Sequence, residues 1–211
     1  AKSEMSGGAE KFAVEYGGST QTFTETVNGG IEPEFTLDGA AEPVPKSLDL
    51  MIMCDTTGSM GDELEYLVCE LEDVVTRIRS ENANVPTRIS VNFYRDEGDE
   101  YVVREYPFTT DLAAAVTAIS EQTADGGDTP EAVHTALKSA VSHNWDEDSV
   151  KVMFLVLDAP PHGDVQIIDE TVKHVGEAAE KGIRIVPVAA SGVDKSCEYL
   201  LRSMALKTGG T

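Results

Sequence analysis

The sequence has few basic residues and few aromatic ones. Sixteen Lys and Arg stand against 38 Asp and Glu, which gives a net charge of −22 at pH 7 with His neutral. Such an excess of negative charge repels phosphate backbones and anionic lipid headgroups. We therefore expect no nucleic-acid partner, whereas cations and basic protein surfaces are compatible with the charge. Salt adaptation would explain the same acidity.

Cysteine is scarce, and no long apolar run occurs. Three cysteines, Cys54, Cys69 and Cys197, are too few for a disulfide framework, and Cys54 and Cys69 are expected to be buried thiols. No run approaches the ~18–20 apolar residues of a membrane span, so we expect no membrane insertion. No signal peptide is visible. Because the chain starts at Ala1 and its first segment is rich in β-forming residues, we favour an extracellular or cell-surface location, with a cytoplasmic one as the alternative.

The 211 residues, 41% of them apolar, suffice for one core with an appendage. Residues 1–43 contain three runs rich in Thr, Phe and Val, set apart by glycine pairs, which are typical of short strands joined by turns. These runs are Lys11–Tyr16, Thr20–Val27 and Ile31–Leu37. The sequence thus predicts a β-rich appendage over residues 1–43 and a separate domain over residues 44–211.

Strands and helices alternate within residues 44–211. Predicted strands are Leu48–Cys54, Thr87–Tyr94, Tyr101–Phe108, Val150–Leu157 and Ile183–Ala189. Predicted helices cover residues 64–78, Leu112–Glu121, Pro130–Ser142, Val165–Lys181 and Ser196–Lys207. This order favours an α/β fold with a doubly wound, mostly parallel sheet and one antiparallel edge hairpin. The pattern stops after a helix, where such a sheet would often add one more edge strand.

Carboxylates follow the strands at the edge where ligands bind in open α/β sheets. Asp55 and Asp158 come directly after buried strands, and Asp128 with Thr129 precedes a predicted helix. Each has a structural alternative as a helix cap, and Asp128, Pro130 and Glu131 together make a plausible capping arrangement. Carboxylates converging on one edge would repel one another by about 4 kcal/mol per close pair. We therefore expect a cation between them.

Oxygen ligands indicate Mg²⁺, Mn²⁺ or Ca²⁺ and argue against Zn²⁺. The four histidines have no zinc-binding spacing. His162 lies near the expected edge, where a role in stabilising the loop is favoured over a role as general acid.

The segment Asp55-Thr56-Thr57-Gly58-Ser59 resembles the D-x-[S/T]-x-S signature of the von Willebrand factor A family and its metal-ion-dependent adhesion site. The resemblance extends over about three quarters of the chain and is closest to the bacterial and hemicentin-like branch. It implies metal ligation by Asp55, Thr57, Ser59 and Asp158. In the third loop the family usually has Thr; counting back from the predicted helix favours Asp128 there, with Thr129 as the competitor.

The resemblance implies a binding module without catalysis, in which an Asp or Glu of a partner protein completes the coordination of the metal. Such a module is expected to be part of a larger protein. One alternative is a metal-dependent phosphohydrolase of the haloacid-dehalogenase kind, but Thr57 stands where that chemistry needs a second acid. Another is a metal-free structural A domain, against which the intact ligand set argues.

Overall fold

A computed structural model describes residues 9–16, 19–26, 47–61, 64, 66, 70, 73, 76–77, 80, 85–126 and 130–210. The chain divides into two compact units, Ala1–Val44 and Pro45–Thr211. In the first unit, β1 (Ala9–Tyr16) pairs with β2 (Ser19–Thr26) in an antiparallel hairpin in which Phe12 is opposite Phe23. The third strand predicted there, Ile31–Leu37, lies outside the described residues.

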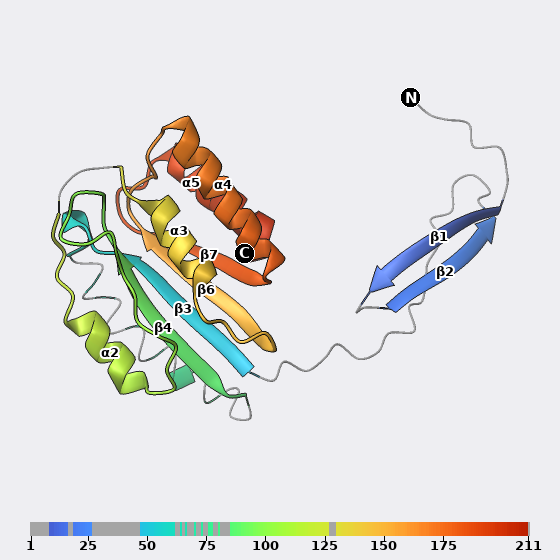
Figure 1. The fold of residues 1–211 in the computed structure, drawn as a ribbon, viewed down its shortest axis with the longest axis horizontal. Coiled ribbons are helices and arrows are strands. Elements are labelled where there is room, and N and C mark those ends of the chain that lie inside the picture. The colour runs from blue at the N-terminus through green and yellow to red at the C-terminus, as the bar shows by residue number, and fades with distance from the viewer. Residues whose placement is uncertain are drawn as a thin grey trace. The chain divides into compact units, whose positions relative to one another are not determined.

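The second unit is built on a five-stranded sheet with the order β5-β4-β3-β6-β7 (Figure 1). Its strands are β3 (Ser47–Asp55), β4 (Thr87–Tyr94), β5 (Val103–Arg104), β6 (Ser149–Leu157) and β7 (Ile183–Ala189). All neighbours are parallel except β5, which runs antiparallel to β4. The central strands are buried on both faces, as their continuous apolar runs require. The predicted α/β class with one antiparallel edge is confirmed.

Helices cover both faces of this sheet. In Figure 1, α3 (Val133–Ser142), α4 (Val165–Glu180) and α5 (Lys195–Thr208) lie along one face and α2 (Leu112–Ser120) on the other. One apolar core packs Met51, Met53 and Leu155 against α3, α4 and α5. A second core packs Leu50 and Ile52 against α2. The described residues among 61–80 are helical, as predicted, and a short 3-10 helix, η1 (Gly58–Met60), precedes them.

The edge hairpin is shorter than predicted. Of the expected strand Tyr101–Phe108, only β5 pairs in the ladder. Beyond it, side chains of β4 take over the hydrogen bonding: Asn92 Oδ1 accepts the backbone N–H of Tyr106 at 2.8 Å, and Ser90 Oγ donates to the carbonyl of Tyr106 at 2.7 Å. Pro107 then offers no backbone donor at all. A pattern of alternating side chains cannot reveal such substitutions.

The third helix begins later than predicted. We expected helix from Pro130, but α3 begins at Val133, and its N-cap Ala132 makes no side-chain capping bond. The backbone N–H of Glu131 instead donates to the carbonyl of Pro160 at 3.0 Å, and Glu131 forms an isolated bridge with Pro161. The alternative interpretation that put Pro130 and Glu131 in the first turn of this helix is therefore wrong. The count that favoured Asp128 as the third-loop ligand started from this incorrect helix boundary.

At the start of β3, the buried carboxylate of Asp49 is fully paired. Arg88 donates to both of its oxygens, at 2.8 and 2.6 Å, and the backbone N–H of Asp146 donates to Oδ2 at 2.8 Å. Burial acts to raise the pKa of Asp49, but these hydrogen bonds and the charge of Arg88 hold it below its usual value. This end of the sheet therefore has its charges compensated.

Candidate metal site at the carboxyl ends of the strands

Strands β3 and β6 bring two carboxylates to the same end of the sheet. Cys54 is paired with Val156 in the parallel register, so Asp55 and Asp158 follow on neighbouring strands, which lie about 4.8 Å apart. Asp55 is 0% exposed and Asp158 is 9% exposed. We call this end of the sheet the rim, defined by Asp55, Asp158 and the loops beside them.

The Asp55 carboxylate is only half satisfied. Its Oδ1 accepts hydrogen bonds from the backbone N–H of Thr57 at 2.8 Å and from the Thr57 hydroxyl at 2.7 Å. Its Oδ2 is buried and has no hydrogen-bond partner among the described residues. Burial raises the pKa of Asp55 to about 6; the two Thr57 bonds oppose this shift, and the negative charge of Asp158 adds to it. The ionised form therefore lacks a compensating cation.

Glu131 is a third buried acid at the rim, and it is not among the ligands predicted from the sequence. It is 1% exposed, and in the part of the chain that the structure describes its Oε2 has no hydrogen-bond partner. Burial, and then the charges of Asp55, Asp96, Asp158 and Asp99, raise the pKa of Glu131 to about 8. Its backbone contact with Pro160 places it beside the segment that follows Asp158. No sequence signal separates such a carboxylate from a helix cap.

Tyr94, at the end of β4, belongs to the same group. Its hydroxyl is buried without a partner, and burial together with the charges of Asp55, Cys54, Glu131 and Asp158 raises the pKa of Tyr94 well above its usual value. Asp158 Oδ1 is also buried and unpartnered. Four orphaned oxygens, on Asp55, Tyr94, Glu131 and Asp158, thus occur in one electrostatically coupled group. Buried polar atoms normally have partners, so this concentration points to a bound ligand.

The positive charge of Arg95, which acts on Asp55, does not balance the negative charge of the rim. Arg95 is 3% exposed and directs its guanidinium towards backbone carbonyls, with Nε 3.2 Å from Thr56 O and Nη2 2.7 Å from Thr123 O. It also lies over the ring of Tyr101. Its charge lowers the pKa of Asp55, but by less than burial and Asp158 raise it. Arg95 therefore fastens the loops of the rim without neutralising its acids.

The other residues predicted for the site lie in different surroundings. Thr57 is buried and bonded to Asp55. Ser59 is exposed in η1. Asp128 and Thr129 lie outside the described residues, so the choice between them stays a prediction. His162 stabilises the rim as expected, because its Nε2 donates to Asp96 Oδ1 at 2.7 Å. That bond joins the loop after β6 to the loop after β4.

The donor chemistry of the rim fits a hard cation. The four orphaned atoms of Asp55, Tyr94, Glu131 and Asp158 are all oxygens. Three of them belong to carboxylates, which are ligands of Mg²⁺, Mn²⁺ and Ca²⁺ rather than of Zn²⁺. Among the described residues, however, no three His, Cys, Asp or Glu side chains are close enough together to hold an ion. The described carboxylates would therefore need to draw closer, or other oxygens would need to contribute.

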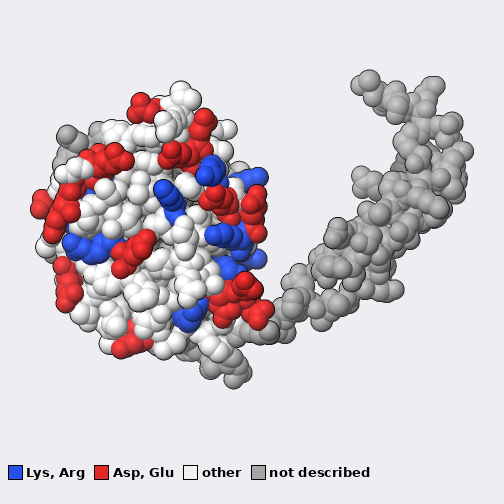
Figure 2. Space-filling model, in the orientation of Figure 1, with Lys and Arg blue, Asp and Glu red and all other residues white. Residues whose placement is uncertain are grey.

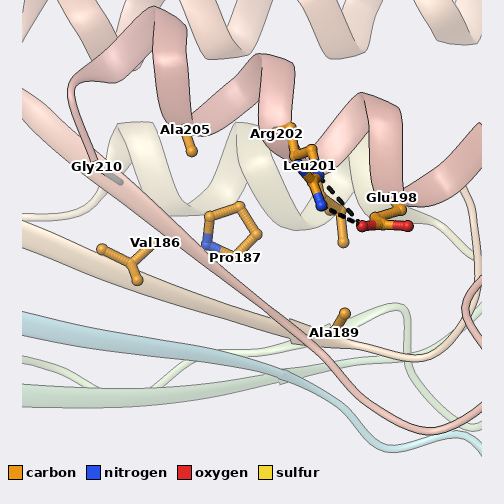
Figure 3. Close-up of a pocket in the computed structure, with 8 residues that line it drawn as sticks. All are labelled: Val186, Pro187, Ala189, Glu198, Leu201, Arg202, Ala205 and Gly210. Carbon is orange, nitrogen blue, oxygen red and sulfur yellow. Dashed lines mark hydrogen bonds and ion pairs between the residues drawn. The ribbon is translucent and has the colours of Figure 1, made fainter.

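Neither the described residues on the face drawn in Figure 2 nor the pocket in Figure 3 shows a cluster of acids comparable with the rim. Figure 2 shows acidic and basic side chains interspersed on the face in view. The pocket in Figure 3 lies between β7 and α5, lined by Val186, Pro187 and Leu201 among others, with the Glu198–Arg202 ion pair at its side. It holds no orphaned carboxylate. Its chemistry is that of an apolar groove along the edge of the sheet.

Comparisons with known proteins agree with this fold. Residues 49–206 match the family model of the von Willebrand factor A domain. A protein of Acanthamoeba polyphaga mimivirus that is named an ariadne-like RING finger protein is 34% identical over 119 residues, which are 54% of this chain and 11% of that protein. The match therefore spans about a tenth of the relative's length.

A solved structure adds support for the fold alone. The conserved hypothetical protein BatB from Bacteroides thetaiotaomicron is 16% identical, with a TM-score of 0.56, and the similarity covers 78% of this chain and 88% of that one.

In the described part of the chain, no helix is both long enough and apolar enough to cross a membrane.

Proposed function

The chain belongs to the von Willebrand factor A family, a family of protein-interaction modules, and from this premise we propose that it binds a partner protein through a divalent cation held at the rim. Asp55, Thr57, Ser59 and Asp158 would hold the cation, with Asp128 or Thr129 from the third loop. Glu131 is added to this set because its orphaned oxygen belongs to the same group. The cation would be Mg²⁺, Mn²⁺ or Ca²⁺.

The observation that carries the proposal is the set of buried carboxylate oxygens without partners on Asp55, Asp158 and Glu131. A buried ionised carboxylate is strongly destabilising unless a charge or hydrogen bonds compensate it. A bound divalent cation would supply that charge and would present a positive centre to an incoming carboxylate. An Asp or Glu of the partner would then complete the coordination.

The proposed role needs no catalytic residue. A phosphohydrolase would use Asp55 as nucleophile. The backbone N–H and the hydroxyl of Thr57 both donate hydrogen bonds to Asp55 Oδ1, and Thr57 stands where a second acid is required. The match covers only 11% of the mimivirus protein, which favours the proposal that this domain acts as a module within a longer protein. An extracellular or cell-surface location is part of the proposal, with a cytoplasmic one as its alternative.

The test uses peptides displayed on phage, panned against the immobilised chain in Mg²⁺ and eluted with EDTA. The proposal predicts enrichment of peptides that contain Asp or Glu, whose binding is lost in EDTA and in the Asp55→Asn variant. Glu121→Gln, at the exposed C-cap of α2, is the matched control and should bind like the wild type. Enriched peptides that bind equally well in EDTA and to Asp55→Asn would refute the proposal.

A further inference from the structure

The outward side of α4 carries three exposed apolar side chains. Val165 is 76% exposed, Ile168 45% and Val172 61%. They are three and four residues apart, so they form one stripe along the helix. α4 packs against α3 and α5, and its buried side, which includes Thr171 and Val175, is turned inwards. We call Val165, Ile168 and Val172 the α4 stripe.

The α4 stripe continues into an apolar pocket between α4 and α5. Ile168 and Val172 line this pocket, whose volume is about 280 Å³, together with Pro161 and Leu200 among others. Single exposed apolar side chains are ordinary on protein surfaces, and the solvent side of a helix is usually polar. A stripe that joins an apolar pocket is instead typical of a surface that contacts another protein.

The spacing of residues along α4 makes the stripe complementary to itself. Consider a second copy whose α4 runs antiparallel, related by a two-fold axis beside positions 170 and 171. Ile168 is then opposite Val172 of the second copy, and Val165 is opposite its Gly176. A Cβ at Gly176 would meet nothing within 4 Å outside its own helix, so the branched side chain of Val165 has room to approach. The two-fold axis forms each of these contacts twice.

The charges beside the stripe match in the same arrangement. Asp169 and Lys173 are both exposed on one flank of the stripe, four residues apart. In the antiparallel pair, Asp169 is opposite Lys173 of the second copy, and Lys173 is opposite its Asp169. In a parallel pair, like charges would meet instead. Because the chain has a net charge of −22, two copies repel each other in general, and these two ion pairs offset the repulsion where the helices meet.

Lys173 is available for such a contact. Within one chain its Nζ is 3.8 Å from Glu177 Oε1, a distance at which the pair is held only loosely. Glu177 Oε2 is already bonded to Nδ1 of His174 at 2.9 Å. Glu177 therefore keeps a partner when Lys173 turns towards the second copy.

We propose that two copies of this chain associate through antiparallel α4 helices, with the α4 stripe buried between them. The interface uses none of the proposed metal ligands, so it does not depend on the proposed function. Two associated copies would present two rims. A partner with two suitably spaced acidic sites would then be held more tightly than by a single copy.

Sedimentation equilibrium of the full chain in EDTA tests the proposal, over concentrations from about 1 to 100 μM. This range suits a contact between single helices, which lies at the small end of protein interfaces. The average mass should rise from that of one chain towards that of two. A chain that stays monomeric throughout, or that assembles without limit, would overturn the proposal.

The apolar contact is tested with Val165→Ser combined with Val172→Ser. The association constant should fall at least about tenfold, because four valine side chains leave the interface. Both residues are exposed, so the fold should persist, and circular dichroism checks this directly. Leu206→Ser, which removes an exposed apolar side chain from α5, is the matched control and should associate like the wild type. Unchanged association of the double variant would refute the interface.

The antiparallel register is tested by exchanging the charges. Asp169→Lys alone should weaken association about fivefold, because Lys then meets Lys173 of the second copy. Adding Lys173→Asp should restore it, since both pairs re-form with opposite sense and the net charge is that of the wild type. Failure of the exchange to restore association would overturn this register. All of these measurements are made in EDTA, so loss of cation binding at the rim and loss of association are observed separately.

Discussion

Strand β3 carries a buried carboxylate near each of its ends, and the two have opposite surroundings. Asp49 receives three hydrogen bonds, two of them from Arg88, and its pKa is lowered despite burial. Asp55 has one oxygen that finds no hydrogen-bond partner within the described ranges, and burial raises its pKa to about 6. A protein that encloses an acid for stability supplies its partners from the chain. This difference between Asp49 and Asp55 is the basis of the proposal that a cation completes the surroundings of Asp55.

Removing the paired acid should have the largest effect. Asp49→Asn leaves Arg88 without its buried partner, and breaking such a pair costs about 3–5 kcal/mol of unfolding free energy. Urea denaturation in EDTA measures this loss. Cation binding, measured on the folded variant, should be unchanged. A loss below about 1 kcal/mol would remove the distinction drawn between the two ends of β3.

Removing the unpaired acid, Asp55, should weaken cation binding and leave the free energy of unfolding in EDTA undiminished. In Asp55→Asn we expect affinity for Mn²⁺, followed by electron paramagnetic resonance, to fall at least about 100-fold, or roughly 2.7 kcal/mol. Stability in EDTA should stay equal or rise, because an uncompensated buried charge is gone while the Asn oxygen can still accept the Thr57 bonds. A variant that is strongly destabilised and yet binds Mn²⁺ normally would reverse the assignment.

Adding the cation should stabilise the folded protein, and the stabilisation should depend on the acids of the rim. At a concentration 100 times its dissociation constant, Mg²⁺ should add about 2.7 kcal/mol. That corresponds to a rise in Tm of roughly 5–10 °C for a chain of this size. Scanning calorimetry with and without EDTA measures the rise, which should persist in Glu121→Gln and vanish in Asp158→Asn. Equal stabilisation of Asp158→Asn would place the ion elsewhere.

The two ends should also respond oppositely to pH. Asp55 and Glu131 have folded pKa values of about 6 and 8, above their unfolded values, so the folded state binds more protons and stability falls as pH rises through this range. Asp49 has a lowered pKa, so its contribution is lost on acidification below its unfolded value of 3.8.

We therefore expect the metal-free protein to lose about 1–2 kcal/mol between pH 5 and pH 8, allowing for relaxation around the buried acids. Urea denaturation at several pH values measures this slope. In Glu131→Gln the part above pH 6 should disappear. A stability that rises over this range in EDTA would contradict the raised pKa values.

The sequence predicted the fold because its elements carry strong local signals. The apolar runs at Leu50 and Leu155 mark strands buried on both faces, and the helix α5 ends at Gly209, which has φ +69° as a left-handed cap requires. The hairpin was overpredicted because side chains of Ser90 and Asn92 replace ladder bonds, a tertiary effect that alternation does not encode.

The site was predicted in part. Asp55 and Asp158 follow buried strands in parallel register, so their convergence could be inferred from topology alone. Glu131 could not be found, because its burial depends on the backbone contact with Pro160 across the rim.

Calorimetric titration of the EDTA-treated chain with Mg²⁺, Mn²⁺ and Ca²⁺ tests the central claim most directly. The account predicts one site per chain for at least one of these ions, with the heat of binding abolished in Asp55→Asn and retained in Glu121→Gln. Absence of binding heat for all three ions, at temperatures chosen to separate zero enthalpy from no binding, would contradict it. Undiminished binding to Asp55→Asn would contradict it equally.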